Sequence, residues 1–476
     1  MTNQLPKIST GLESLDRLTE GGLPKHRATL VVGAPGAGKT VFALQILANA
    51  AQRGTPCAFV TFEEGEDEIL ANARSFTWDP SALVGNGLTF FDGRPTLEAL
   101  VTGEFELDGL TAGLGAMADQ GALDFVVLDG LDQVLSGLSD VARRRAELYR
   151  VLNTLTSKGV TVLITAKGDD EGVVASADDT FMQFAAQCVI ALRRRTATGA
   201  MVRTLQVVKY RGSAFGGSEV PYVIDEEGIV PALVGRSALQ HHLSRERVPT
   251  GVPDLDDVLS GGYLRGSVTM ISGAPGTAKT TLAASFVERA ADNGERALYV
   301  AFDESFQQIV LDVQSLNRHL DRHQETGAIS GLSLSGLGVT AEENYIAIRR
   351  AINRVQPSVV VIDPVSAFMK GYDSPRARGV AERMVDMLKS KGITAVITSL
   401  VEPDSDFTAS AISTLADSWI SLSYTLTGVS RGRALSVIKA RGTQHSHDIL
   451  HLVLGDDGVR ISETQTGQAP VTRRPI

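Results

Sequence analysis

Two glycine-rich segments have the composition and spacing of loops that bind phosphate. GAPGAGKT occupies residues 33–40, GAPGTAKT occupies residues 273–280, and the residues that flank the two segments repeat in register. Glycines let backbone N–H groups converge on phosphate oxygens, while the lysine reaches the β- and γ-phosphates and the threonine hydroxyl binds Mg²⁺. We therefore predict two sites for ATP and Mg²⁺, with Thr40 and Thr280 as the metal ligands. The candidate nucleotide-binding residues are Gly33, Gly36, Ala37, Gly38, Lys39, Thr40, Gly273, Gly276, Thr277, Ala278, Lys279, Thr280 and Thr281.

The second loop departs from the first at one position. Ala278 stands where the first loop has Gly38. A methyl group at this position is tolerated if the backbone φ is negative and is strained if φ is positive. We expect nucleotide binding to survive, because Lys279 and Thr280 are retained.

Each half also places an aspartate at the end of an apolar run. Asp129 ends the segment FVVLD, and Asp363 ends the segment VVVID. This is the Walker B arrangement, in which a carboxylate at the carboxyl edge of a sheet lies near the metal ion. The alternative is an aspartate that only caps the following turn.

Two acidic pairs follow another strand in matching places. Glu63 and Glu64 come after CAFVTF, and Asp303 and Glu304 come after ALYVAF. A carboxylate at this edge can orient or deprotonate an attacking water or hydroxyl, so these four residues are the candidate catalytic groups. A solvated acidic pair is the simpler interpretation of either one alone, and recurrence in both halves favours the catalytic role.

The segments KYRG and KARG are paired in the same way. They contribute Lys209 and Arg211 in the first half, and Lys439 and Arg441 in the second. Residues two apart on a strand point to the same side. In a ring of subunits these side chains would reach the nucleotide of a neighbouring subunit, where an arginine finger raises the rate about 10³–10⁵-fold. An exposed basic strand end is the alternative.

Alternating strands and helices must position these residues. Apolar residues at helical spacing after each loop predict a helix there, and continuous apolar runs predict strands covered on both faces. The fold class is therefore α/β, with a mainly parallel twisted sheet flanked by helices in each half and a terminal β-hairpin at residues 202–212 and 433–442. The predicted strands are residues 28–33, 57–62, 125–129, 160–166, 268–273, 297–302, 359–363 and 393–398, and the helical residues are Phe42, Ile46, Ala50, Leu282, Phe286 and Ala290.

The duplication divides the chain into two domains, predicted at residues 1–234 and 248–462. Residues 235–247 are polar and are predicted to be a linker. Residues 463–476 are polar, contain two prolines and show no periodicity, so we predict a disordered tail.

Composition excludes several classes of protein. A formal net charge of −10 disfavours general binding to nucleic acid or membrane surfaces. The two cysteines, Cys57 and Cys188, lie in apolar segments, so we expect buried free thiols and neither a disulfide framework nor a zinc site. There is no apolar N-terminal segment and no apolar stretch of membrane-spanning length, and we expect a cytoplasmic protein.

Taken together, these features resemble the KaiC family, RecA-superfamily ATPases and autokinases at the centre of the bacterial circadian clock. The likeness runs from about Ile8 to Ser462, and its specific signs include the acidic pairs, the KxRG segments, and STGLESLD near the start. The most specific sign is SAISTLAD at residues 410–417. It resembles the family's phosphorylation segment, in which an adjacent serine and threonine are modified. Ser413 and Thr414 match these two residues, and Thr408 matches a nearby third hydroxyl.

The resemblance implies two tandem RecA-like domains that assemble as a double-ring homohexamer with ATP between subunits. It implies slow ATP hydrolysis in the first ring, with Glu63 and Glu64 as catalytic carboxylates. In the second ring it implies transfer of phosphate to Ser413 and Thr414 of the adjacent subunit.

The resemblance also marks a second departure, besides Ala278, and two partners. Asp303 stands where the family has the glutamate general base and is one methylene shorter, while Glu304 matches the second carboxylate. A KaiB-like protein and a downstream signalling protein are the expected partners. Clock members of the family carry a longer tail that captures KaiA, and only fourteen residues follow Ser462 here, so we expect no KaiA binding and a timer or signalling ATPase.

Two other classes of function stay open. A RecA- or DnaB-like nucleic-acid motor would share the loops and the hexamer, but it needs a basic surface and binding that weakens steeply with salt. Residues 143–145 and 193–195, both RRR, are the only candidate patches. An ATP-held hexameric scaffold without kinase activity is favoured by Asp303 and Ala278.

Overall fold

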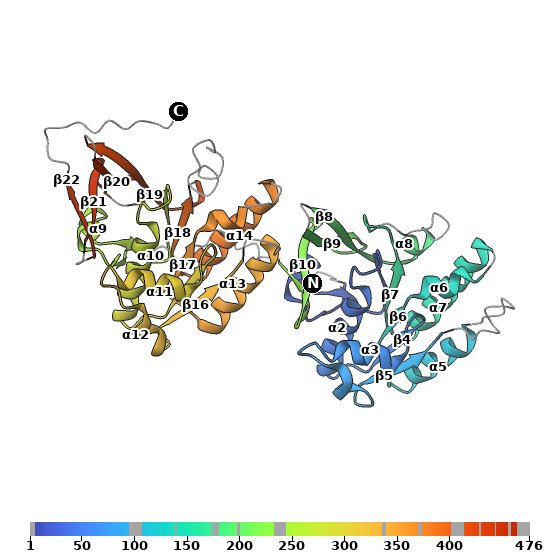
Figure 1. The fold of residues 1–476 in the computed structure, drawn as a ribbon. Helices are drawn as coiled ribbons and strands as arrows, with labels where there is room; N and C mark the ends of the chain where they lie inside the picture. Colours follow the sequence, from blue (N-terminus) through green and yellow to red (C-terminus); the bar gives the residue numbers. More distant parts are fainter. Residues whose placement is uncertain are drawn as a thin grey trace. The chain divides into compact units, whose positions relative to one another are not determined.

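A sheet flanked by helices organises each half of the chain (Figure 1), and its central strands are buried. The chain forms two units, divided between Gly235 and Arg236, and each is described by itself. The computed structural model describes residues 5–94, 107–138, 140–172, 174, 180–197, 200–232, 244–335, 339–369, 374–400, 414–427, 430–442, 444–455 and 458–463. Most of the predicted linker and tail lies outside these residues, so the predicted domain limits stay predictions.

The first unit is built on a nine-stranded sheet with the order β11-β10-β9-β8-β3-β7-β6-β4-β5. The six strands from β8 to β5 are parallel, and β9, β10 and β11 extend the sheet as antiparallel strands. The elements are β1 (Lys7–Ile8), α1 (Glu13–Leu18), β2 (Leu23–Pro24), β3 (Ala28–Gly33), α2 (Lys39–Gln52), β4 (Cys57–Thr61), α3 (Glu66–Ala73), η1 (Pro80–Leu83), β5 (Leu88–Asp92), α5 (Asp108–Asp119), β6 (Phe125–Asp129), α6 (Leu131–Ser136), α7 (Val141–Ser157), β7 (Thr161–Lys167), α8 (Phe181–Ala185), β8 (Cys188–Ala197), β9 (Ala200–Tyr210), β10 (Val220–Asp225) and β11 (Gly228–Pro231).

The second unit repeats this plan with the strand order β16-β15-β17-β18-β14-β19-β20-β21-β22. Strands β16 to β19 are parallel, and β20, β21 and β22 are antiparallel additions. The elements are β12 (Arg247–Val248), α9 (Pro253–Val258), β13 (Tyr263–Leu264), β14 (Val268–Gly273), α10 (Lys279–Asp292), β15 (Ala297–Ala301), α11 (Phe306–Gln314), α12 (Leu320–Glu325), β16 (Ile329–Ser333), α13 (Ala341–Val355), β17 (Val359–Asp363), η3 (Val365–Met369), α14 (Ser374–Ser390), β18 (Thr394–Leu400), β19 (Ser418–Thr427), β20 (Ser430–Ala440), β21 (Leu450–Gly455) and β22 (Gly458–Glu463).

Side chains of the central strands alternate between two apolar clusters. On β3, Val31 packs with α2 on one face of the sheet, while Leu30 and Val32 pack with α7 on the other. Burial on both faces explains why these strands are continuous apolar runs. The predicted α/β fold is confirmed, with one difference at its end. The sequence predicted one hairpin in each half, whereas the structure has two in succession, β19–β20 and β21–β22 in the second unit.

The parallel arrangement gathers the candidate residues at one edge. Strands β3, β4 and β6 end at Gly33, Thr61 and Asp129, and Thr61 pairs directly with Asp129. Carboxyl ends of parallel strands meet at the same edge, which is where open α/β sheets bind their ligands. Cys57 and Cys188 are buried free thiols, as expected. In the described part of the chain, no helix has the length and apolarity needed to cross a bilayer.

Candidate nucleotide-binding sites

The first glycine loop turns between β3 and α2. Gly36 and Gly38 adopt the left-handed backbone region, with φ of 76° and 89°. This conformation curls a loop so that its backbone N–H groups can surround an anion. Lys39 begins α2, and its ammonium donates to the carbonyl oxygen of Gly33 at 3.0 Å. Burial lowers the pKa of Lys39, although nearby carboxylates act in the opposite direction.

The second loop has the same backbone despite its alanine. Gly276 and Ala278 have φ of 75° and 84°, so the methyl group of Ala278 is carried on a left-handed residue and is strained. The Lys279 ammonium donates to the carbonyl oxygen of Gly273 at 2.8 Å, and burial lowers the pKa of this lysine too. The loop therefore retains its shape and its cation.

Three other predicted loop residues turn their side chains into the protein. The Thr277 hydroxyl donates to the carbonyl oxygen of Ala274 at 2.8 Å, and Thr281 is buried in α10. Ala37 is buried, and its carbonyl oxygen accepts a hydrogen bond from the Tyr222 hydroxyl. These residues can offer a ligand only their backbone groups.

In the first unit the Walker B aspartate joins the loop threonine. One oxygen of Asp129 accepts from the Thr40 hydroxyl at 2.9 Å, and the other accepts from the Thr165 hydroxyl at 2.6 Å. Burial raises the pKa of Asp129 to about 6. A hydroxyl and a carboxylate beside a phosphate loop are oxygen donors that suit Mg²⁺, which keeps several waters and uses few protein ligands.

The Walker B aspartate of the second unit has a different partner. One oxygen of Asp363 accepts from the Thr398 hydroxyl, as in the first unit, and the other accepts from the Tyr299 hydroxyl at 2.6 Å. Tyr299 is fully buried on β15. No hydrogen bond joins Thr280 to Asp363, both of which the structure describes. The surroundings of the two candidate metal positions are therefore built differently.

The acidic pair of the first unit is tied to its surroundings. The Gln133 side-chain amide donates to the Glu63 carboxylate at 2.7 Å, and the Thr61 hydroxyl donates to the backbone carbonyl of Glu64 at 2.7 Å. Burial raises the pKa of Glu64, and neighbouring carboxylates add to the rise. Glu64 is therefore a better proton acceptor than an ordinary surface glutamate.

The acidic pair of the second unit lies at the matching edge. Asp303 and Glu304 follow β15, and both are exposed. The Glu304 carboxylate is nevertheless partly shielded from solvent, which is the largest cause that raises its pKa, and the charges of Asp312, Asp363 and Asp303 act in the same direction. Ala301 occupies the place of Thr61. Alanine has no hydroxyl, so the hydrogen bond from Thr61 to the backbone of Glu64 has no equivalent at this position.

The paired basic residues hold the ends of helices within their own unit. The Lys209 ammonium donates to the carbonyl oxygens of Gln183 and Ala186, both at 2.6 Å, at the end of α8. Arg211 follows the end of β9. Contacts of this pair with a neighbouring subunit stay a prediction.

The second pair holds the candidate phosphorylation segment. The Lys439 ammonium donates to the carbonyl oxygen of Ala416 at 2.7 Å, and the Arg441 guanidinium donates to that of Thr414 at 3.3 Å. Thr414 is exposed, while Ser413 and Thr408 lie outside the described residues.

Sequence reasoning missed several residues around the loops. Asp132 follows the first Walker B strand, and its Oδ1 is buried without a hydrogen-bond partner in the described part of the chain. Arg194 of β8 approaches Gly36 of the first loop. At the matching tip of the second loop, Tyr424 donates to the carbonyl of Pro275 at 2.8 Å, and Arg433 donates to the carbonyl of Gly276 at 2.9 Å. The sequence signal that could have identified Arg194, Tyr424 and Arg433 is a charged or aromatic residue within an otherwise strand-like segment.

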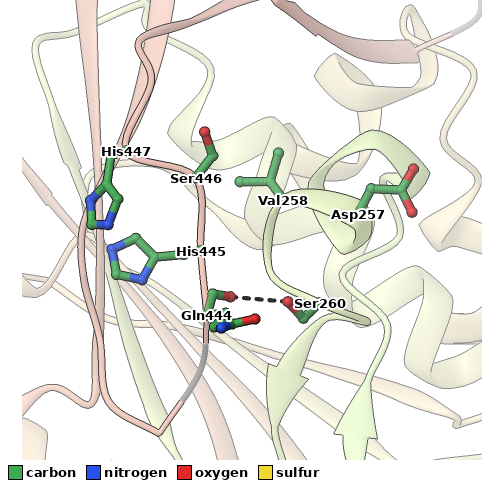
Figure 2. A pocket seen from close by; sticks show the side chains of 7 residues that line it. All are labelled: Asp257, Val258, Ser260, Gln444, His445, Ser446 and His447. Carbon is green, nitrogen blue, oxygen red and sulfur yellow. Dashed lines mark hydrogen bonds between the residues drawn. The ribbon is translucent and has the colours of Figure 1, made fainter.

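A separate hollow of the second unit carries no candidate chemistry. It lies between α9 and the segment before β21, where the rings of His445 and His447 lie 4.9 Å apart and Asp257 points away from them (Figure 2). Among the residues that the structure describes, no group of three or more His, Cys, Asp or Glu side chains is arranged to hold a metal ion.

Comparisons with known proteins agree with this architecture. The KaiC ATPase family model matches residues 8–232 and 248–466. The chain is similar to the circadian clock protein KaiC2 of Synechocystis sp., with 34% identity over 98% of this chain and 83% of the relative. It is 32% identical to the circadian clock oscillator protein KaiC of Prochlorococcus marinus, over 97% of this chain and 93% of the relative. The corresponding protein of Synechococcus elongatus is 31% identical over 97% and 90%. Because the family match spans most of both units, the chain belongs to the KaiC family of ATPases.

Proposed function

We propose that this chain binds ATP and Mg²⁺ in both units and uses them differently. The first unit hydrolyses ATP slowly, and the second phosphorylates serine or threonine of its own sequence and later releases that phosphate. The protein then acts as a circadian-type timer or a signalling regulator, in keeping with the clock proteins it resembles. The observation that carries this proposal is the acidic pair that follows β4 and β15, the strands whose carboxyl ends lie beside those of the Walker B strands β6 and β17.

A difference between the two units supports the division of labour. Lys209 and Lys439 bind equivalent carbonyls, those of Ala186 and Ala416. Two residues before these carbonyls, the exposed side chain is Phe184 in the first unit and Thr414 in the second. Only the second unit offers a hydroxyl there, so only it has a phosphate acceptor at this position.

The proposed transfer uses the residues of the second site in defined roles. Glu304, with Asp303 beside it, accepts the proton of the Ser413 or Thr414 hydroxyl as its oxygen forms a bond to the γ-phosphorus. The bond between that phosphorus and the β–γ bridging oxygen breaks, and ADP leaves with the electron pair. Lys279 holds the phosphates, and bound Mg²⁺ neutralises the charge that develops on them.

The proposal includes self-association as a double-ring homohexamer. Exposed apolar residues adjoin the paired lysines in sequence: Val208 is 49% exposed and Ile438 is 52% exposed. A second copy of the chain would cover them and bring Lys209, Arg211, Lys439 and Arg441 to the neighbouring nucleotide. A KaiB-like protein and a downstream signalling protein remain the proposed partners.

Replacing each acidic pair with amides, one unit at a time, tests whether the two units have separate activities. Glu63→Gln with Glu64→Gln should lower steady-state ATP hydrolysis about 100-fold or more, because a positioned base contributes roughly 10²–10⁴-fold. Asp303→Asn with Glu304→Gln should leave most hydrolysis in place and abolish autophosphorylation, measured by transfer of radiolabelled phosphate. Equal loss of both activities in both variants would contradict separate roles.

A scaffold held together by ATP is the second candidate. The strained Ala278 and the shorter Asp303 favour it, because both weaken the second site as a catalyst without removing its lysine. A nucleic-acid motor is disfavoured by the ion pairs of residues 193–195. Arg193 pairs with Glu219, Arg194 with Asp170, and Arg195 with Glu171.

A further inference from the structure

The two units differ by one hydroxyl at their Walker B aspartates. Phe59 on β4 and Tyr299 on β15 occupy equivalent positions, two residues before the residue that pairs with the aspartate on the next strand. Residues two apart on a strand share a face, so both rings lie on the aspartate side. Only Tyr299 has a hydroxyl, and it donates to Asp363 at 2.6 Å.

This hydroxyl takes the place of the loop threonine. In the first unit, the carboxylate oxygens accept from Thr165 and Thr40. In the second unit, the equivalent oxygens accept from Thr398 and Tyr299. Among these described residues, Thr280 is thus left without the bond to the aspartate that Thr40 has.

The substitution matters for a metal ion. A threonine hydroxyl that donates its proton to the Walker B carboxylate keeps its oxygen lone pairs free and fixed in direction for Mg²⁺. A phenol that donates to the same carboxylate oxygen competes for it and also withdraws charge from it. Thr40 is therefore preorganised for the ion, and Thr280 is not.

We propose that Tyr299 weakens Mg²⁺ binding at the second nucleotide site, so that the second unit requires a higher Mg²⁺ concentration than the first to bind ATP. The two sites then respond to free Mg²⁺ over different ranges, and Tyr299 is the residue that sets the difference. Tyr299 is a positioning residue, since it acts through Asp363. The inference rests on the proposed nucleotide sites.

A reciprocal exchange tests it in the full-length chain. Tyr299→Phe installs the first unit's own residue and removes a single oxygen. The readout is binding of a fluorescent non-hydrolysable ATP analogue (mant-AMPPNP), titrated with Mg²⁺, in a Lys39→Ala background that disables the first loop. Phe59→Tyr is measured in a Lys279→Ala background. Tyr345→Phe is the matched control, because it removes another buried phenol oxygen of the second unit, one that faces Met387.

In Tyr299→Phe, the Mg²⁺ concentration at half-saturation should be about threefold to tenfold lower than in the parent background, because one competing hydrogen bond is removed. In Tyr345→Phe, this concentration should be unchanged. Phe59→Tyr should raise the same concentration at the first site by a similar factor. If the Phe59→Tyr variant does not fold, the result for Tyr299→Phe is sufficient to test the inference. An unchanged or higher half-saturation point in Tyr299→Phe would overturn the inference while leaving nucleotide binding intact. No binding of the analogue to the second unit at any Mg²⁺ concentration would overturn the proposed nucleotide site together with the inference.

Discussion

At the scale of single residues, the second phosphate loop carries strain that the first does not. Ala278 keeps the left-handed backbone of its glycine counterpart, and its methyl group packs in the apolar cluster of the second unit. A methyl on Gly38 would meet the terminal methyl of Ile224 at 2.6 Å, so the Ile224 side chain would have to move to admit the same change. The second loop has thus accommodated a residue that would displace a neighbouring side chain in the first.

Exchanging these residues should change stability in opposite directions. Ala278→Gly should stabilise the second unit by up to about 1 kcal/mol, because release of about 1–2 kcal/mol of strain exceeds the added entropy of the unfolded chain. Gly38→Ala should destabilise the first unit by more than that. The chain has one tryptophan in each unit, Trp78 and Trp419. Urea unfolding followed by the fluorescence of either, with the other changed to Phe, therefore separates the units. A less stable Ala278→Gly would contradict the assigned strain.

At the scale of elements, a half-buried ion pair fixes the end of the candidate phosphorylation segment. The Lys389 ammonium of α14 donates to the carbonyl of Leu415 at 2.7 Å and to the Asp417 carboxylate at 2.8 Å. The other oxygen of Asp417 accepts from the backbone N–H of Val268 on β14 at 2.9 Å. These contacts tie helix α14, the segment and strand β14 together, and Thr414, a candidate phosphate acceptor, directly precedes the anchored Leu415.

Removing the cation of this pair should loosen the segment. Lys389→Met leaves the Asp417 carboxylate without its partner, and the expected loss of stability is about 1–3 kcal/mol, because the pair is mostly buried. Lys391→Met, at an exposed lysine just after the same helix, is the control and should be neutral. Urea unfolding followed by Trp419 fluorescence measures both. Equal stability of the two variants would show that the pair does not anchor the segment.

The strands were predicted more accurately from the sequence than the contacts between them. Strands such as residues 28–33, 125–129 and 359–363 were predicted to the residue, because burial on both faces leaves an uninterrupted apolar run. The contact of Tyr299 with Asp363 was not predicted, because it depends on the register between two strands and joins residues 64 apart in sequence. The roles of Ser413 and Thr408 came only from resemblance, and these residues lie outside the described part of the chain.

At the scale of the whole molecule, the proposed chemistry needs more than one copy of the chain. Phe184 is 66% exposed on α8, whose end is held by Lys209. A single exposed ring does not by itself define an interface, and we propose that a second copy of the chain covers this one because it adjoins the proposed intersubunit contact of Lys209.

Assembly should therefore depend on nucleotide and on this surface. Light scattering should give the mass of a hexamer with Mg-ATP and a smaller mass without nucleotide. Phe184→Glu should prevent ring formation, because a charge would be buried without a partner. Leu311→Glu changes an equally exposed apolar residue of the second unit, at 60% exposure, and should leave assembly intact. A monomeric wild-type protein in the presence of Mg-ATP would exclude nucleotide contacts between subunits.

The central claim is that the second unit phosphorylates its own chain. Intact-mass and phosphopeptide analysis after incubation with Mg-ATP, beside the Asp303→Asn/Glu304→Gln variant, tests this most directly. We predict phosphate on Ser413 or Thr414 in the wild-type protein and none in the variant. An unmodified wild-type protein that still hydrolyses ATP would contradict the claim and leave a double-ring ATPase whose second unit is a nucleotide-held scaffold.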